Sequence, residues 1–269
     1  MKLCKPSFEI IEQSSGLEGV YKQIEYAGRT CYKSSDKITE DSAKPFVDRM
    51  IKSQHYAMLE HGTIYLKIPY EMAWNYLCDN WVLDNYSTNP YTWVNGDGGI
   101  YYVTTNYRNI IENGWLEDLK YLCEPTEFHK KRITVHFTLP IAISREFCRH
   151  RVFSFAEMST RYCNFNKNKF GNELTFIEDN WSNPNLLQLI ETEYMKAIEG
   201  GKKPQEARNI LPLCTKTELV MTGFVSDWQH FFRLRSRIAE TGKPHPQAQE
   251  LADPLMDEFV KRGIMETLL

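Results

Sequence analysis

The 269-residue sequence predicts one domain of the α/β (α+β) class with a helical C-terminal half. Three patterns support this prediction: a strand-like alternation from Arg132 to Leu139, a hairpin signal at Asn95–Gly99, and helix start and stop signals throughout the second half. Strands mixed with helices, followed by a helical half, are typical of this fold class. A chain of this length can bury a sizeable core without disulfides or a structural metal.

Two elements are predicted before Tyr70. Apolar residues recur at helical spacing from Ser42 to Gln54, which indicates a helix. The segment from Thr63 to Ile68 alternates like a strand, and we expect Pro69 to end it because proline has no N–H for the ladder.

The segment from Tyr70 to Tyr107 is rich in aromatic residues, with ten tyrosines and tryptophans. Inside it, Asn95–Gly99 separates two strand-like stretches, a pattern typical of a hairpin turn. A phosphate-binding glycine loop is the alternative, but no helix start follows these glycines. We therefore expect a hairpin here.

Further along, apolar residues alternate from Arg132 to Leu139, and Pro140 is expected to open a short helix. Another strand is predicted at Leu174–Ile177. From Asn185 onward we expect the chain to be almost wholly helical. The signals there are a helix end at Gly200–Gly201, helix starts at Pro204 and near Pro246, a cap at Ser226 and a stop at Gly263.

The composition narrows the class of protein. It is 42% hydrophobic and 25% charged, as in an ordinary soluble enzyme and unlike a disordered chain. A net charge of −3 gives no reason to expect nucleic acid or a membrane as partner. Met1–Pro6 lacks the apolar core of a signal peptide, and the seven cysteines form no C-x-x-C pair. We expect a metal-free protein of the reducing cytoplasm that binds small molecules.

Positive charge concentrates between Arg145 and Lys169, where six cations and two acids give a local charge of +4. Arginine dominates the first part, and its planar guanidinium suits bidentate binding of phosphate. Ser154, Ser159 and Thr160 add hydroxyls that can bind phosphate or sugar oxygens. From charge alone, a solvated basic surface, a nucleic-acid patch and a phosphate site all remain open.

The order of residues in this segment is more specific than its charge. Arg149–Arg151 spells Arg-His-Arg, and Ser159 follows after seven residues. This pattern resembles the signature of the flavin-dependent thymidylate synthases, and the tail Glu157–Tyr162 matches it as well.

Weaker matches to the same family occur in the right order on both sides. Gln54–His61 resembles the family's upstream segment, Pro204–Pro212 the helix whose arginine contacts uracil, and Ser226–Arg235 the helix of the substrate-activating arginine. The resemblance covers about 45–68, 132–178 and 204–263. It implies a single synthase domain over 1–269, with a central, mostly antiparallel sheet flanked by helices and an aromatic-rich insertion at about 70–130.

The position of Arg235 on its expected helix is unusual even when the family resemblance is set aside. On a helix, Trp228, Phe231 and Phe232 share an apolar arc that includes Arg235, whereas Arg233 points the other way. A charge on an apolar face needs a partner, because burying it alone is costly. That partner is either a protein carboxylate or a ligand that becomes anionic during the reaction.

The resemblance implies reductive methylation of dUMP to dTMP by a homotetramer with active sites between subunits. Methylenetetrahydrofolate would supply the carbon, and FAD reduced by NADPH the hydride. No cysteine nucleophile is implied, and the sequence has no Pro-Cys pair. Arg235 would be the catalytic residue, stabilising negative charge near uracil N3 and O4. The implied dUMP ligands are Glu146, Arg149, Glu157, Met158, Ser159, Thr160, Arg161, Arg208 and Arg235, and the implied FAD ligands are His55, Arg149, His150, Arg151, Glu157 and His230.

Three residues depart from the family pattern. Glu146 stands where a glutamine is common, Ala57 replaces a hydroxyl residue near FAD, and Ala156 replaces a common asparagine. Two other function classes stay open: a nucleotide- or RNA-binding module without catalysis, and a metal hydrolase. The hydrolase would use Cys148, His150 and Glu157, whose spacing matches no known ligand pattern.

Overall fold

The computed structural model describes residues 1–73, 80–167, 171–179 and 183–268. Trp74, Tyr76, Cys78 and Lys169 lie outside these ranges, so predictions that involve them stay predictions. Within the described ranges, no helix is long and apolar enough to cross a membrane.

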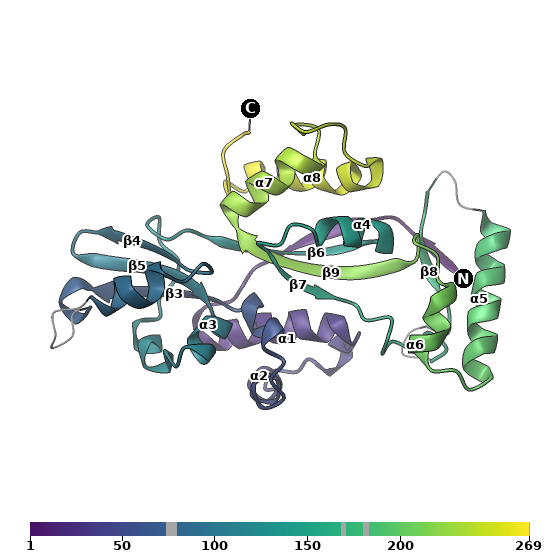
Figure 1. The fold of residues 1–269 in the computed structure, drawn as a ribbon, viewed down its shortest axis with the longest axis horizontal. Helices are drawn as coiled ribbons and strands as arrows, with labels where there is room; N and C mark the ends of the chain where they lie inside the picture. The colour runs from purple at the N-terminus through teal and green to yellow at the C-terminus, as the bar shows by residue number, and fades with distance from the viewer. Residues whose placement is uncertain (74–79, 168–170, 180–182, 269) are drawn as a thin grey trace.

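The described elements alternate between strands and helices along most of the chain (Figure 1). The strands are β1 (Lys2–Cys4), β2 (Ser7–Ile11), β3 (Thr63–Pro69), β4 (Trp93–Asp97), β5 (Ile100–Asn106), β6 (Arg132–Pro140), β7 (Ser154–Glu157), β8 (Thr175–Ile177) and β9 (Lys216–Phe224). The helices are α1 (Gly16–Cys31), α2 (Ala43–Lys52), α3 (Tyr107–Glu112), α4 (Ile141–Phe147), α5 (Pro184–Glu199), α6 (Pro204–Ala207), α7 (Val225–Arg235) and α8 (Pro246–Lys261). Short helical turns are η1 (Ser35–Lys37), η2 (Tyr56–His61), η3 (Tyr70–Met72), η4 (Leu83–Ser87), η5 (Leu116–Tyr121) and η7 (Arg208–Ile210).

A four-stranded antiparallel sheet in the order β2-β6-β9-β7 forms the centre of the fold. The strands β6 and β9 pair along their whole length, from Arg132 opposite Phe224 to Pro140 opposite Lys216. Helices lie above and below this sheet (Figure 1). The predicted class, with a mostly antiparallel sheet flanked by helices, is therefore confirmed.

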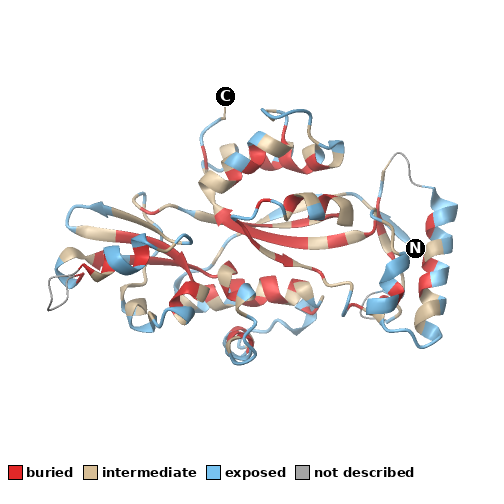
Figure 2. Cartoon of the chain, in the orientation of Figure 1, coloured by how far each residue is buried: buried red, intermediate tan, exposed pale blue. Residues whose placement is uncertain are grey.

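One face of this sheet is apolar and holds the main core. Val135 and Phe137 of β6 point the same way as Leu219 and Met221 of β9, and all four are fully buried. They pack against α4, α7 and α8, and Trp228 of α7 is central among the aromatic side chains there. Within this sheet, β9 carries the longest run of buried residues, whereas the edge strand β2 has none (Figure 2).

The opposite face is polar and lies against α1 and η2. The hydroxyls of Thr134 and Thr222 are 2.8 Å apart, and Nδ1 of His61 is 2.8 Å from the Thr222 hydroxyl. Complete burial, helped by nearby Arg132, lowers the pKa of His61 to about 3. This histidine is therefore neutral and belongs to the internal packing.

The strand β9 contradicts the expectation that the chain is almost wholly helical after Asn185. Leu219, Val220 and Met221 are consecutive and fully buried, because β9 lies between β6 and β7 with helices on both faces. A strand buried on both faces lacks the alternation that marks a half-buried strand, so the pattern was uninformative here.

The cap predicted at Ser226 is also wrong. Helix α7 begins at Val225, and the carboxylate of Asp227 accepts a hydrogen bond from the N–H of Phe224 at 2.9 Å. An acidic residue in the first turn thus satisfies the free amide of Phe224, and Ser226 lies inside the helix instead of capping it. The helices predicted before Gly200 and after Pro204 and Pro246 are confirmed.

Two strands of the aromatic segment, β4 and β5, join β3, which precedes the segment, in a separate three-stranded sheet of order β3-β5-β4. Strands β4 and β5 are the predicted hairpin, with Gly98 and Gly99 at φ values of 55° and 81° in its turn. Side chains of this sheet share one core with α1 and α2, which attaches it to the rest of the molecule. Whether it is an insertion relative to the family stays a prediction.

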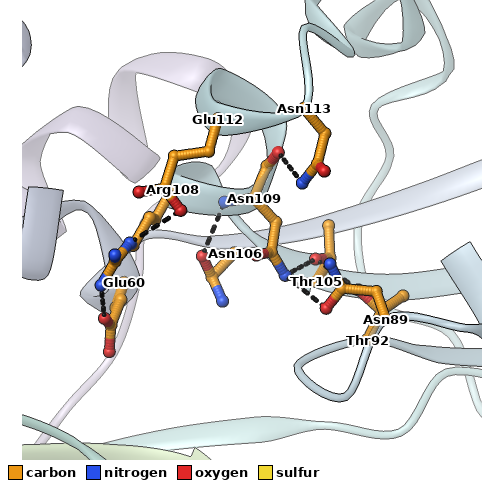
Figure 3. A network of polar contacts seen from close by, with 9 residues as sticks. All are labelled: Glu60, Asn89, Thr92, Thr105, Asn106, Arg108, Asn109, Glu112 and Asn113. Carbon is orange, nitrogen blue, oxygen red and sulfur yellow. Dashed lines mark hydrogen bonds and ion pairs between the residues drawn. The ribbon is translucent and has the colours of Figure 1, made fainter. Parts of the chain in front are cut away.

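A polar network fixes the end of this sheet (Figure 3). The amide of Asn109 donates to the Thr105 hydroxyl at 3.0 Å and to Oδ1 of Asn89 at 3.2 Å. Arg108 bonds Glu112 within α3 and Glu60 in η2, at 2.9 and 2.6 Å. The Arg108–Glu60 pair therefore ties the aromatic sheet to the segment that begins with His55.

Candidate active site

The Arg-His-Arg segment lies in a tight turn between α4 and β7. Helix α4 ends at Phe147, whose carbonyl accepts from the N–H of His150 at 3.0 Å, and the carbonyl of His150 accepts from Phe153 N–H at 3.1 Å. His150 is 7% exposed, whereas Arg149 and Arg151 are exposed. The turn thus directs the histidine inward and both guanidinium groups outward.

Arg235 at the end of α7 reaches this turn. Its Nη1 donates to Oε2 of Glu146 at 2.7 Å, its Nη2 to the Glu146 carbonyl at 3.2 Å, and its Nε to Nε2 of His150 at 3.1 Å. The Arg235 and Glu146 side chains are 18% and 31% exposed. Of the two partners that the sequence left open for Arg235, the described structure shows the protein carboxylate, supplied by one of the departures from the family pattern.

His150 is held in its neutral form. Desolvation by burial lowers its pKa to about 4, and the charge of Arg235 and the nearby His230 act in the same direction. The rings of His150 and His230 are 6.2 Å apart between centroids, and His230 is exposed. Neutral Nε2 of His150 can therefore accept the Arg235 hydrogen bond at neutral pH, with the proton on Nδ1.

A cavity of about 610 Å³, here called the nucleotide cavity, opens beside α4. Its lining brings together the loop after β7 and the segment around η7, which are far apart in sequence. Ser159 and Thr160 supply hydroxyls, and Arg145 and Arg208 supply two exposed cations. The complete lining is Ile141, Arg145, Glu157, Met158, Ser159, Thr160, Arg208, Asn209, Leu211, Pro212 and Leu213.

Glu157 lies at the inner side of the nucleotide cavity. Its Oε1 accepts a hydrogen bond from the Ser144 hydroxyl of α4 at 2.7 Å. Burial raises the pKa of this carboxyl, while the Ser144 hydrogen bond and the charge of Arg145 oppose the rise. The carboxylate is thus pre-oriented by α4 and can accept hydrogen bonds from sugar hydroxyls.

The other predicted nucleotide ligands differ in exposure. Nη1 of Arg208 lies 3.5 Å from the Thr160 hydroxyl, and Nε of Arg161 donates to Oε1 of Gln205 at 3.2 Å. Both arginines are exposed and can turn toward a bound anion. Met158 is 3% exposed and belongs mainly to the core beneath the cavity.

The sequence did not single out every residue of the cavity. Arg145 contributed to the local charge of +4 but was not assigned a ligand role, and Asn209 was not considered. The charge count was the available signal for Arg145. No local signal marked the apolar wall at Leu211–Leu213, since it approaches only through folding.

His55 lies elsewhere. It precedes η2, is exposed, and lines a different cavity from the one that holds Ser159. No contact recorded among the described residues joins it to His150 or His230. The predicted site residues therefore divide into a nucleotide group, a turn group around Arg235, and His55.

Metal chemistry finds no support in the described part of the chain, where no group of three His, Cys, Asp or Glu side chains is placed to hold a metal ion. For the hydrolase alternative, burial raises the pKa of the Cys148 thiol to about 11, and nearby Glu157 adds to the rise.

The chain also resembles known proteins. A sequence model of the thymidylate synthase complementing protein family matches residues 102–262, more than half of the chain. A probable flavin-dependent thymidylate synthase of Paramecium bursaria Chlorella virus 1 is 29% identical over 151 residues, 48% of this chain and 68% of that protein. A flavin-dependent thymidylate synthase of Synechocystis is 32% identical over 135 residues, 44% of this chain and 62% of the relative.

Among solved structures, a UMP/dUMP methylase from Streptomyces cacaoi bound with 5-Br dUMP aligns over 97% of this chain and 93% of its own. The TM-score is 0.45 and the identity 16%, a likeness too low to establish a shared function. The family match is different, because it spans the Arg-His-Arg turn, the nucleotide cavity and Arg235. The chain therefore belongs to the thymidylate synthase complementing protein family, the flavin-dependent thymidylate synthases.

Proposed function

We propose that this protein converts dUMP to dTMP, with methylenetetrahydrofolate as carbon donor and NADPH as reductant through FAD. In this reaction the C5–H bond of uracil is replaced by C5–CH3, the C5 proton is released, and tetrahydrofolate and NADP⁺ are the other products. The observation that carries the proposal is the nucleotide cavity, where Arg145 and Arg208 meet the Ser159 hydroxyl of the family signature. Glu146, the partner of Arg235, follows Arg145 directly in α4.

The nucleotide cavity suits the phosphate and sugar of dUMP. Arg145 and Arg208 are exposed cations that can neutralise a phosphate, and Ser159 and Thr160 can donate hydrogen bonds to it. Glu157 can accept from the deoxyribose hydroxyl. Ser159 acts here as a ligand: its hydroxyl oxygen accepts from Arg161 N–H at 3.3 Å, and among the described residues no base is hydrogen-bonded to it.

Arg235 would stabilise an anionic uracil. A guanidinium has five N–H donors, and Glu146 and His150 accept three of them, which leaves one on Nη1 and one on Nη2. These two donors would bind N3 and O4 of a uracil anion, as paired guanidinium N–H groups bind a carboxylate. Three fixed contacts keep these donors in place, so no reorganisation is needed when charge develops on the base.

The donor set around the turn fits a flavin dinucleotide. Arg149 and Arg151 project outward and can hold a pyrophosphate, and His150 and His230 offer imidazole rings at short range. FAD, when bound, supplies the hydride that no side chain can donate. The residues would fix its position and exclude water from the uracil face.

A second copy of the chain would complete the site. If His55, His150 and His230 all contact one flavin, separate subunits must bring them together, because the described chain does not. We therefore propose a homotetramer with active sites between subunits. Its other partners would be small molecules, and its location the cytoplasm.

The test is tritium release from dUMP labelled at C5, with methylenetetrahydrofolate and NADPH present, in samples with and without FAD. Release that requires both flavin and NADPH supports the reaction as written. Folded, flavin-loaded protein that binds dUMP without release would instead be a nucleotide-binding protein without methylation activity. Glu146, Ala57 and Ala156 would then be exchanged first.

A further inference from the structure

A second cavity, of about 450 Å³, is also cationic. Arg29, Lys37 and Arg49 line it together with His55. None of its described lining residues is acidic, and Ser34, Ser53 and Tyr32 add hydroxyls. Of the residues assigned above to dUMP or FAD, only His55 reaches it.

Packing makes two of these cations converge. The guanidinium carbons of Arg29 and Arg49 lie 4.9 and 5.2 Å from the centroid of the Phe46 ring, which is 3% exposed. Arg29 is further fixed by Glu25 at 2.8 Å, a carboxylate that is 1% exposed. Glu25 compensates the charge of Arg29, so Lys37 and Arg49 provide the excess positive charge of the cavity.

Helix polarity accounts for only part of this arrangement. Arg29 and Arg49 lie in the last turns of α1 and α2, where cations stabilise the carbonyl ends of helices. Lys37 belongs to neither helix, because it is in the exposed turn η1 that folds over the same cavity. Lys52 is also in the last turn of α2 but does not line the cavity, so helix polarity and cavity charge can be separated experimentally.

The second cavity adjoins the nucleotide site. The N–H of Ser159 donates to the carbonyl of Cys31 at 2.9 Å. The next residue, Tyr32, lines the second cavity, and its ring centroid is 5.6 Å from that of Tyr162. The segment Cys31–Tyr32 therefore connects the second cavity to the segment Ser159–Tyr162 of the nucleotide site.

We propose that the second cavity binds the anionic part of a co-substrate, a phosphate or carboxylate group, through Arg49 and Lys37. This inference rests on the proposed function, since that reaction needs two anionic co-substrates besides dUMP and the bound FAD. The 2′-phosphate of NADPH and the glutamate carboxylates of the folate share the required chemistry. A guanidinium binds either group through parallel N–H donors, and an ammonium adds a mobile point charge.

The experiment is calorimetric titration of the full-length, FAD-loaded protein with two matched pairs of probes. The first pair, 2′,5′-ADP and 5′-AMP, reports binding of the 2′-phosphate. The second pair, the triglutamyl and monoglutamyl forms of tetrahydrofolate, reports binding of the added carboxylates. Each pair is measured on the parent, on Arg49→Gln and on Lys52→Gln, which removes one charge from the same helix turn outside the cavity.

The preference within a pair is the ratio of the two dissociation constants. We expect Arg49→Gln to reduce this ratio about tenfold for one pair, as for loss of one charge-assisted contact. The affected pair identifies the anion, and Lys52→Gln should stay within about twofold of the parent. Lys37→Gln, on the exposed turn, should act in the same direction and covers the case that Arg49→Gln does not fold.

Preferences that stay within about twofold of the parent in both cavity variants would overturn the inference, as would a parent without any preference. Failure of the proposed function would look different. It would appear as absence of tritium release from a protein that still distinguishes the paired probes.

Discussion

Arg235 and Arg208, two of the four arginines assigned to dUMP, are held in opposite ways. Arg235 makes three hydrogen bonds to Glu146 and His150, and its side chain is 18% exposed. Arg208 is exposed, and its contact with the Thr160 hydroxyl is 3.5 Å long. A fixed guanidinium suits a reacting group whose position must not vary, whereas a loose one can follow a phosphate as it enters.

The difference also concerns net charge. The carboxylate of Glu146 balances the positive charge of Arg235. The ligand-free site therefore offers oriented N–H donors with little net charge. Arg208 and Arg145 remain uncompensated by any ion pair among the described residues, and they provide the attraction for a dianionic phosphate. Affinity and activation are thus expected to depend on different arginines, and four experiments test this division.

The largest effect is expected for Arg235→Ala. Removing a positioned donor to a developing anion costs about 10²- to 10³-fold in turnover. Binding of dUMP should change little, because the phosphate ligands remain. Turnover and dUMP affinity should be measured separately, with flavin absorbance as the check of folding. Retention of full activity would remove Arg235 from its assigned role.

Protonation of His150 would disturb the fixed arginine. The folded-state pKa of His150 is about 4 against an ordinary value of 6.5, so the unfolded chain binds a proton first as the pH falls. The free energy of unfolding therefore decreases as the pH falls from about 6.5 to 4, by at most about 1.4 kcal/mol per pH unit.

The check is thermal unfolding at pH 7 and pH 5 for the parent and for His150→Gln, which keeps a side-chain acceptor for Arg235. The difference in unfolding temperature between pH 7 and pH 5 should be smaller in the variant than in the parent. Buried His61 contributes equally to both proteins. An unchanged difference would show that His150 is not the titrating group.

For the loose arginine, Arg208→Ala is expected to weaken dUMP binding about tenfold, the usual effect of losing one charged contact with phosphate. Turnover at saturating dUMP should fall by less than about threefold. Lys202→Ala, an exposed cation just before α6 that does not line the cavity, is the control. A selective loss of turnover instead of affinity would reverse the roles of the two arginines.

The smallest effect is expected for Glu146→Gln. Glutamine can still accept a hydrogen bond from Nη1 of Arg235 but no longer neutralises it, so turnover should rise a few-fold through stronger stabilisation of the uracil anion. The rate should be measured from pH 6 to 9, since a stronger field also favours the anion at lower pH. A fall in turnover would mean that Glu146 serves to orient Arg235.

Much of the site was accessible from the sequence because its signals are local. The Arg-His-Arg turn, the hydroxyls at Ser159 and Thr160, and the arc that places Arg235 beside Trp228 all depend on spacing within one segment. Local signals also indicated β6 by its alternation, the β4–β5 hairpin by its turn residues, and several helix ends by proline and glycine. The roles assigned to these residues remain predictions until the variants are measured.

Only the tertiary structure decided how these segments meet. Arg235 and Glu146 are 89 residues apart, and their pairing requires β9 to lie between β6 and β7. Since β9 is buried on both faces, its residues carry no alternation, and the sequence could not place it. The same strand order brings η7 to the loop after β7 and creates the nucleotide cavity. Local chemistry thus follows from spacing along the chain, whereas partners follow from long-range strand pairing that no local pattern encodes.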